Sequence, residues 1–510
     1  MDFYEEISKE LRSGSIRDRE RLNQVKKELC KKHGLTEVPT NTEILKKTGV
    51  QKNLLLKKPS RSMSGVSVVA IMTHPQECPG DCIYCPCGEA AQSYTGKEPA
   101  ALRAGMSGFD PFRQTEERVE QLAAIGHPTS KIELIIMGGT FTAMPPQYQE
   151  SFVLDAFRAL NGNDSPTLQE AQRLNEKAAH RCVGMTFEIR PDYCEQNHIN
   201  DMLRFGATRV ELGVQTIYND VYEKIRRGHT VEDVIAATQL LKDSFLKTNY
   251  HLMPGLPFSS KDRDLAMFKQ VFSDKRFKPD MLKIYPCLLA KKEFYANTKA
   301  HELYKSGKWT PLGNQEAAEL ISEATRFFPK WVRIMRIQRD IPKPYIEAGV
   351  TAGNLRELVH EKNKKKGIKC NCIRCREIRD KKPKEAKLMR QDYDASGGKE
   401  IFLSFEDTKQ DLLLGLLRLR VPGKPFRKEI GPRTLGIREL HVYGPETDIG
   451  KNGKAQQHQG LGKQLIQEAE KIAVDDFDAR EMLVMSGVGA REYYRKFGYG
   501  LEGCYMGKRL

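Results

Sequence analysis

Six short segments rich in apolar and β-branched residues alternate with amphipathic stretches between residues 65 and 340, and this alternation constrains the fold most. The segments are 66–74, 131–140, 182–191, 208–216, 250–257 and 281–289. Residues 231–245 are typical of the amphipathic stretches, with apolar positions at helical spacing. Strands that alternate with helices predict parallel βα units, closed or partly closed into a barrel. Functional residues of such barrels lie at the C-terminal ends of the strands.

The flanking regions have a different composition. Residues 1–64 are predicted to form basic helices, and residues 351–395 are basic and poor in apolar residues, as in a linker or small metal module. From residue 396 the pattern predicts antiparallel strands and then a helix over about 460–474. The prediction is an α/β chain with a partial (βα) barrel over 65–350 and an α+β domain over 396–510.

The chain of 510 residues carries a formal charge of +16. Much of the excess is local, because residues 361–390 hold thirteen basic and four acidic side chains. A charge run is often only a solvated face, but a basic segment beside a cysteine cluster also suits a phosphate backbone. The segment is therefore a candidate nucleic-acid contact.

The sequence suggests a cytoplasmic protein with metal-binding cysteines. No stretch approaches 18 uninterrupted apolar residues, and the N-terminus "MDFYEEISKELRSGS" is acidic and polar, unlike a secretory signal. The twelve cysteines are clumped rather than spread. Thiols stay reduced in the cytoplasm, so clumping favours metal ligation over disulfides.

The first cysteine cluster follows the first predicted strand in "HPQECPGDCIYCPCGEA". Cys78, Cys82 and Cys85 have CxxxCxxC spacing in a loop rich in proline and glycine. Three thiolates can hold three irons of a 4Fe–4S cluster and leave the fourth iron open, whereas structural zinc normally takes four protein ligands. Zinc or a structural role is the weaker alternative. Cys87 is not expected to bind the cluster.

This loop resembles that of the radical S-adenosylmethionine (SAM) family. The resemblance implies a TIM-like radical SAM barrel whose open iron binds SAM and cleaves it to a 5′-deoxyadenosyl radical. It also implies SAM contacts at the ends of the second and third strands, where glycines let backbone approach a ligand closely. The SAM-binding candidates are Gly138, Gly139, Thr140, Glu188 and Arg190.

A second signal lies in "QHQGLGKQLIQEAEKIA", which contains Gln457-x-x-Gly460-x-Gly462 before an amphipathic helix. Backbone N–H groups at such a helix start suit a pyrophosphate. With the strand 438–444 before it and "YYRKFGY" after it, the segment resembles the GNAT acetyltransferase family, which binds acetyl-CoA. The implied acetyl-CoA residues are Glu439, Leu440, His441, Val442, Gln459, Gly460, Leu461, Gly462, Lys463 and Tyr494. Tyr494, or its neighbour Tyr493, is the candidate that protonates the leaving CoA thiolate or positions the thioester.

The combination of both domains resembles the catalytic subunit of Elongator and its stand-alone archaeal and bacterial relatives. "CPGDCIYCP", "QSYTGKEPAALRA", "EIRPDYC", "RRGHT", "RIQRDIP" and "GNLREL" carry this resemblance over about residues 60–510. It implies carboxymethylation of the tRNA wobble uridine at C5: the deoxyadenosyl radical takes a hydrogen from the acetyl methyl, the carbon radical adds to C5, and thioester hydrolysis follows. The compact cysteine spacing favours a stand-alone prokaryotic form, for which partner subunits are not expected; a homo-oligomer stays open.

Two lysines enter the prediction through their positions. Lys131 matches a family lysine implicated in acetyl-CoA contact, although alone it would be a surface lysine. Lys283, in "LKIYP", is a candidate catalytic residue that meets phosphate or substrate, and a buried ion pair is the equally weighted alternative. Tyr84, Tyr94 and Phe141 are only neighbours of the site, and the aromatics that would stack anticodon bases stay unassigned.

The second cluster, Cys370, Cys372 and Cys375, has CxCxxC spacing in the basic linker. Three thiolates that lack one ligand suit structural zinc, with His360 or Cys287 as the fourth ligand. Redox-active cysteines or a second iron–sulfur cluster are alternatives. The linker and the basic N-terminal helices are expected to contact the anticodon stem-loop, with an affinity that depends strongly on salt.

Two rival functions are compatible with parts of the sequence. A protein lysine acetyltransferase with a structural barrel would use Glu439 as the base for the lysine amine. A non-catalytic tRNA-binding scaffold would tolerate loss of either cofactor motif, yet both motifs are present.

Overall fold

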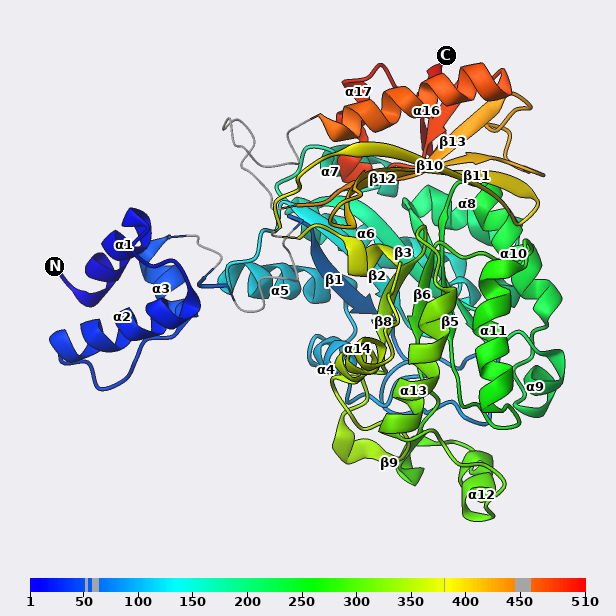
Figure 1. The fold of residues 1–510 in the computed structure, drawn as a ribbon, viewed down its shortest axis with the longest axis horizontal. Coiled ribbons are helices and arrows are strands. Elements are labelled where there is room, and N and C mark those ends of the chain that lie inside the picture. Colours follow the sequence, from blue (N-terminus) through cyan, green and yellow to red (C-terminus); the bar gives the residue numbers. More distant parts are fainter. Residues whose placement is uncertain (51–53, 57–63, 380, 445–459) are drawn as a thin grey trace.

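The computed structural model describes residues 1–510 except 51–53, 57–63, 380 and 445–459. The N-terminal helices are set apart from the rest of the molecule (Figure 1). They are α1 (Phe3–Ser13), α2 (Arg19–Lys32) and α3 (Asn41–Thr48). Asp2 begins α1 with a capping box, in which its side chain accepts from the N–H of Glu5 at 2.8 Å. The three helices enclose their own apolar core, which includes Ile7, Leu22 and Ile44.

The central region is a seven-stranded parallel sheet in the order β1-β2-β3-β4-β5-β6-β8, as the alternation predicts. β1 and β8 are its edges, so the sheet is a half-barrel (Figure 1). Its strands are β1 (Ser67–Met72), β2 (Lys131–Met137), β3 (Arg181–Ile189), β4 (Arg209–Gln215), β5 (Lys247–Leu252), β6 (Met281–Ile284) and β8 (Arg333–Ile337). The six-strand prediction missed β8, whose sequence "RIMRI" is short and carries two arginines.

Helices follow most strands and cover the outside of this sheet. They are α4 (Pro99–Met106), α5 (Pro111–Ala124), α6 (Pro146–Asn161), α7 (Leu168–Asn175), α8 (Gln196–Phe205), α9 (Asn219–Lys224), α10 (Val231–Asp243), α11 (Lys261–Ser273), α12 (Lys299–Lys305) and α13 (Asn314–Ala324). A small two-stranded sheet pairs β7 (Leu289–Ala290) with β9 (Ile346–Ala348). Two further helices, α14 (Leu355–Lys365) and α15 (Ile373–Arg376), lead toward the C-terminal domain.

The C-terminal domain is a second seven-stranded sheet, in the order β10-β11-β12-β13-β14-β16-β15. The strands are β10 (Lys387–Ala395), β11 (Gly398–Asp407), β12 (Leu412–Val421), β13 (Thr434–Val442), β14 (Glu481–Val484), β15 (Gly500–Glu502) and β16 (Tyr505–Arg509). The predicted antiparallel strands and helix are present, with α16 (Leu461–Phe477) against the sheet and α17 (Arg491–Arg495) following. The linker prediction over 351–395 is wrong at its C-terminal end, because β10 pairs with β11. The sequence of β10 resembles that of a linker, because β10 is a mostly exposed edge strand with polar residues.

Buried charges join the barrel to the C-terminal domain. Arg438 Nη2 lies 2.5 Å from Asp280 Oδ1, and Arg420 Nη2 lies 2.5 Å from Asp243 Oδ1. Lys242, Glu400 and Arg418 complete this network, and all seven side chains are at most 1% exposed. Because desolvated charges are stable only when paired, the network fixes the two domains against each other.

The described residues contain no helix with the length and apolar character that a membrane crossing needs.

Candidate active site

A cavity of about 860 Å³ runs along the inner face of the half-barrel to the C-terminal ends of its strands. All three cysteines of the first cluster line it, and at other points it reaches Ser67 at the start of β1 and Arg374 of α15. Its charged lining is mainly basic. The basic residues are Arg103, Arg118, Arg190, Arg227, Lys283, Arg336, Arg339, Arg356 and Arg374, and the acidic residues are Glu98, Glu188, Glu211 and Asp340. The cavity therefore favours an anionic ligand.

The loop after β1 brings Cys78, Cys82 and Cys85 to this cavity. The N–H of Cys85 donates to the carbonyl of Cys82 at 3.1 Å, and Arg227 Nη1 lies 3.4 Å from Cys82 Sγ. Two groups of potential ligands in the described part of the chain have three ligand atoms within 4.8 Å, and these cysteines are not among them. The wider spacing suits a cluster of several irons better than one ion. The arrangement fits the predicted 4Fe–4S cluster.

The backbone at the end of β2 has a conformation that lets a ligand approach it closely. Gly138 and Gly139 have φ angles of 141° and 78°, where a side chain is strained. A Cβ on Gly138 would overlap with the side chain of Thr73, whereas Gly139 and Thr140 line the large cavity. Two of the three predicted SAM contacts from this strand end therefore lie at the cavity wall.

Several buried polar atoms around the cavity have no hydrogen-bond partner among the described residues. They include Glu98 Oε2, Thr140 Oγ1, Arg190 Nη1, Gln215 Oε1 and Arg227 Nε. Buried polar atoms are rarely left unpaired in a native protein, since each costs free energy. Their donors and acceptors at one cavity fit a polar ligand such as SAM.

The two predicted residues of the third strand have different environments. Glu188 accepts a hydrogen bond from the Tyr94 hydroxyl at 2.8 Å and lies 3.2 Å from Lys283 Nζ. Arg190 forms an ion pair with Asp192 at 2.7 Å, which leaves only its Nη1 for a ligand. Both residues line the cavity.

Lys283 is the centre of a buried ion network in the barrel. Its Nζ contacts Glu211 as well as Glu188, and Glu211 Oε2 lies 2.7 Å from His251 Nε2. Burial alone would lower the pKa of Lys283, but Glu211, Tyr285 and Glu188 raise it well above its usual value. Lys283 therefore presents a permanent ammonium at the cavity wall, and the alternative of a buried ion pair is correct as far as its contacts go.

The predicted acetyl-CoA loop is described only from Gly460 onward; Gln457 and Gln459 lie outside the described residues. Gly460 precedes α16 with a φ of 75°, Leu461 and Gly462 are buried, and Lys463 is exposed. A Cβ on Gly462 would meet the Tyr493 hydroxyl at 2.5 Å and Val442 Cγ2 at 3.6 Å. The helix start, Tyr493 and the end of β13 therefore meet at one place.

The side chains of β13 beside this helix start are mostly committed to partners. Glu439 Oε2 lies 2.7 Å from Arg418 Nε, and although burial opposes it, Arg418 lowers the pKa of Glu439 to about 2. Burial lowers the pKa of His441 to about 4, so this imidazole is neutral at pH 7. Tyr494 is 7% exposed, and burial raises its pKa. The Tyr494 hydroxyl is therefore protonated at pH 7.

Lys131 begins β2 and pairs in register with Arg181 of β3. The C-terminal domain packs at this point, because a Cβ on Gly489 would overlap with the backbone and Cβ of Arg181. Lys131 is thus the strand partner of a residue that contacts the C-terminal domain, and it is not among the residues that line the cavity.

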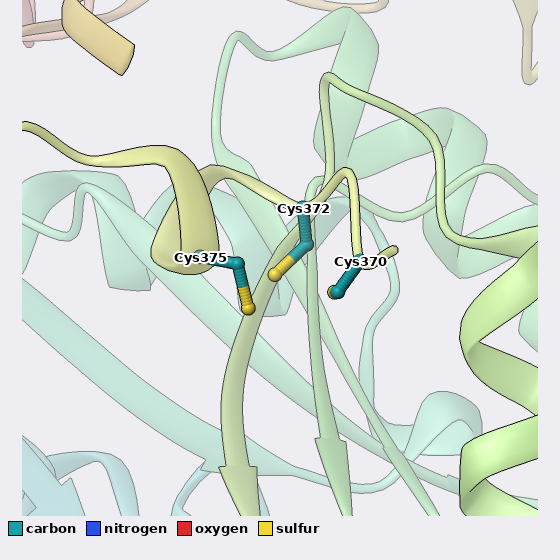
Figure 2. A group of neighbouring side chains, drawn as sticks. All are labelled: Cys370, Cys372 and Cys375. Carbon is teal, nitrogen blue, oxygen red and sulfur yellow. The ribbon is translucent and has the colours of Figure 1, made fainter. Parts of the chain in front are cut away.

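The second cysteine cluster is compact: the three sulfurs of Cys370, Cys372 and Cys375 lie within 4.8 Å of one another (Figure 2). This spacing fits a single metal ion. His360 is close enough to Cys372 for their charges to interact. Cys287 packs instead with Cys82 and Tyr84 in a separate apolar cluster, so it is wrong as a candidate fourth ligand.

Models of four families match consecutive parts of the chain. The ELP3 N-terminal domain matches residues 1–63, the radical SAM superfamily 72–268, the Radical_SAM C-terminal domain 279–365 and the acetyltransferase (GNAT) family 373–499. The predicted radical SAM and GNAT domains are confirmed.

A protein of Methanocaldococcus jannaschii named tRNA uridine(34) acetyltransferase is 51% identical over 99% of this chain and 97% of its own length. The chain belongs to the Elongator complex protein 3 family. The human Elongator complex protein 3 is 42% identical over 96% of this chain and 93% of its own length. The solved structure of Methanocaldococcus infernus Elp3, with residues 1–46 deleted, has a TM-score of 0.78 at 50% identity and covers 88% of this chain and 100% of its own.

Sequence reasoning missed several residues of the cavity. Glu98, Gln215 and Arg227 have unpaired buried atoms there, and Glu211 with His251 supports Lys283. Gln215 also has a φ of 71°, which is unusual outside glycine. The segments "KEPAALRA", "ELGVQT" and "RRGHT" contain four of these five residues, so local motifs could have identified them. Of the aromatic neighbours, Tyr84 and Tyr94 line the cavity, whereas Phe141 is core.

Proposed function

We propose that this protein uses acetyl-CoA and SAM to carboxymethylate C5 of the wobble uridine of tRNA. One observation carries the proposal: the cavity that contains the three cluster cysteines and several unpaired buried polar atoms is lined by nine basic and four acidic residues. Such a site suits an anionic macromolecule whose base must reach a polar cofactor. The names of the relatives support the same substrate, uridine 34 of tRNA.

The proposed reaction uses residues at two places, the cavity of the barrel and the GNAT domain. Cys78, Cys82 and Cys85 would hold a 4Fe–4S cluster, which with SAM supplies a 5′-deoxyadenosyl radical. Gly139, Thr140 and Glu188 would hold SAM against it, and the Lys283 ammonium would donate a hydrogen bond to a uracil carbonyl.

At the GNAT domain, the N-terminus of α16 would bind the CoA pyrophosphate. Tyr494 would donate the proton that the CoA thiolate needs on thioester hydrolysis. The N-terminal helices and the basic segment 361–390 would add phosphate contacts, Cys370, Cys372 and Cys375 would hold zinc, and the proposed location is the cytoplasm.

A protein lysine acetyltransferase is the second candidate, and the environment of Glu439 argues against it. A general base works best with a pKa near the working pH. Glu439 is paired with Arg418 and has a pKa of about 2, so it is a poor acceptor for an ammonium proton.

The test uses full-length protein reconstituted anaerobically with iron and sulfide. It is supplied with SAM, reductant, tRNA and acetyl-CoA that carries a deuterated methyl. We expect deuterium in 5′-deoxyadenosine and a carboxymethyl group on uridine 34, read by mass spectrometry. Cleavage of SAM without deuterium transfer, on tRNA that stays unmodified, would refute the joined reaction and make acetylation of lysine the next function to test.

A further inference from the structure

Two arginines beside the second cysteine cluster have the same kind of environment. Arg356 of α14 and Arg374 of α15 both line the cavity. Arg356 Nη2 donates to the carbonyl of Ile334 at 3.1 Å, and Arg374 Nη1 donates to that of Met335 at 3.4 Å. Both carbonyls belong to β8. Within the described ranges, neither guanidinium forms an ion pair with a carboxylate.

Arg227 and Arg339, which also line the cavity, donate to backbone carbonyls as this pair does, whereas other arginines nearby have a carboxylate partner. Arg333 lies 2.9 Å from Glu377 Oε2, and Arg336 pairs with Asp340. Arg190, at the ends of the barrel strands, pairs with Asp192. Arg356 and Arg374 donate to the carbonyls of adjacent residues of β8, and among the described residues neither has a carboxylate in ion-pair contact. Two like charges arranged in this way would be stabilised by a bound anion.

The cysteine cluster holds this pair in place. Arg374 stands between Cys372 and Cys375 in the sequence, and the N–H of Ile373 donates to the carbonyl of Val332 at 2.9 Å. Cys372 is fully buried. A zinc ion on three thiolates would leave one net negative charge, which balances only one of the two arginines. The remaining positive charge faces the cavity.

We propose that Arg356 and Arg374 form a clamp for one backbone phosphate of the RNA, positioned by a metal ion on Cys370, Cys372 and Cys375. The inference rests on the proposed function and assigns the second cysteine cluster a role in it. Arginine is suited to this task, because its planar fork binds phosphate through two hydrogen bonds. The same cavity reaches the first cluster, so a phosphate held here belongs to the molecule whose base enters the cavity. The phosphates of CoA are the other source, and the test separates the two.

The experiment measures binding of a uridine-34 tRNA transcript to the full chain over a range of KCl concentrations, by fluorescence anisotropy. Arg356→Gln with Arg374→Gln should weaken binding by about tenfold or more, since a bidentate charged contact is lost. The slope of log K against log salt should fall by about 1, the value for one phosphate contact. Zinc content and thermal unfolding of the variant show whether it is folded.

The matched control is Lys269→Gln with Lys275→Gln. It removes the same charge at exposed positions that do not line the cavity and that lie outside the basic segment 361–390. We expect this control to change tRNA affinity by about twofold or less. Cys375→Ser should lose zinc and reduce the salt slope as the arginine variant does.

Three results would overturn the clamp. The first is that the arginine variant binds tRNA with the same affinity and salt slope as its lysine control. The second is that it loses affinity for acetyl-CoA and not for tRNA, which would assign the phosphate to CoA. The third is that Cys375→Ser loses zinc but keeps full tRNA affinity, which would show that the metal does not position the arginines. If the wild-type chain itself does not bind tRNA, the proposed function fails first, and the clamp with it.

Discussion

The buried carboxylates at the interface between the barrel and the C-terminal domain are more completely hydrogen-bonded than several buried polar groups around the cavity. Around the cavity, Glu98, Gln215 and Arg227 each leave a buried atom without a partner among the described residues. At the interface, Asp243, Asp280 and Glu400 are equally buried, and every side-chain oxygen of theirs accepts from a cation or an N–H. Unpaired buried atoms indicate where a ligand belongs, and saturated ones indicate what holds the domains together.

The largest effect is expected at the cavity, from Cys82→Ala. Because three thiolates are needed to hold the cluster, the variant should lose its iron and cleave SAM only at the background rate. Iron content and 5′-deoxyadenosine formation after anaerobic reconstitution measure this. Cys87→Ser is the control and should retain both. A Cys82→Ala chain that still binds four irons would contradict the assignment of the first cluster.

Asp280→Asn tests the interface. The substitution keeps the shape but leaves Lys242, Arg418 and Arg438 short of a counter-charge, which should lower the free energy of unfolding by roughly 3–5 kcal/mol. Denaturant unfolding measures the loss, with the exposed Asp262→Asn as a control that should change it by about 0.5 kcal/mol or less. Equal stability of the two variants would mean that the network does not hold the domains together.

Glu439→Gln tests another buried carboxylate, through the pH dependence of the free energy of unfolding. The pKa of Glu439 falls from 4.5 to about 2 on folding, so its ionised form stabilises the fold at pH above 4.5, and this contribution is lost as the pH falls toward 2. The shift corresponds to about 3 kcal/mol. The stability difference between wild type and variant should be constant between about pH 6 and 8 and about half as large near pH 3. A difference that does not depend on pH would show that Glu439 contributes by packing and not by charge.

Lys283 combines both properties, because it forms buried ion pairs and also lines the cavity. Lys283→Met leaves Glu211 and Glu188 without their shared cation, but Arg209 and His251 still face Glu211, so we expect a loss of about 2 kcal/mol. Adding Glu211→Gln should recover part of this stability while uridine modification stays low. Full activity in the stable double variant would show that Lys283 has only a structural role, as a partner in an ion pair.

The sequence alone determined the architecture and both cofactor chemistries. Short apolar, β-branched segments that alternate with amphipathic stretches of helical period predict parallel βα units, and CxxxCxxC and Gly460-x-Gly462 are local motifs whose spacing indicates their chemistry. It failed at β8 and β10, because edge strands carry polar residues and resemble linkers.

Only the tertiary structure decided which side chains act together. Arg356 and Arg374, or Lys283 and Glu211, are ordinary charges in the sequence, and their partners come from elements far away along the chain. It also placed Cys287 with the first cysteine cluster rather than the second. The reason is physical: the free energy of a buried charge depends on what surrounds it in space, and local residue patterns do not encode that environment.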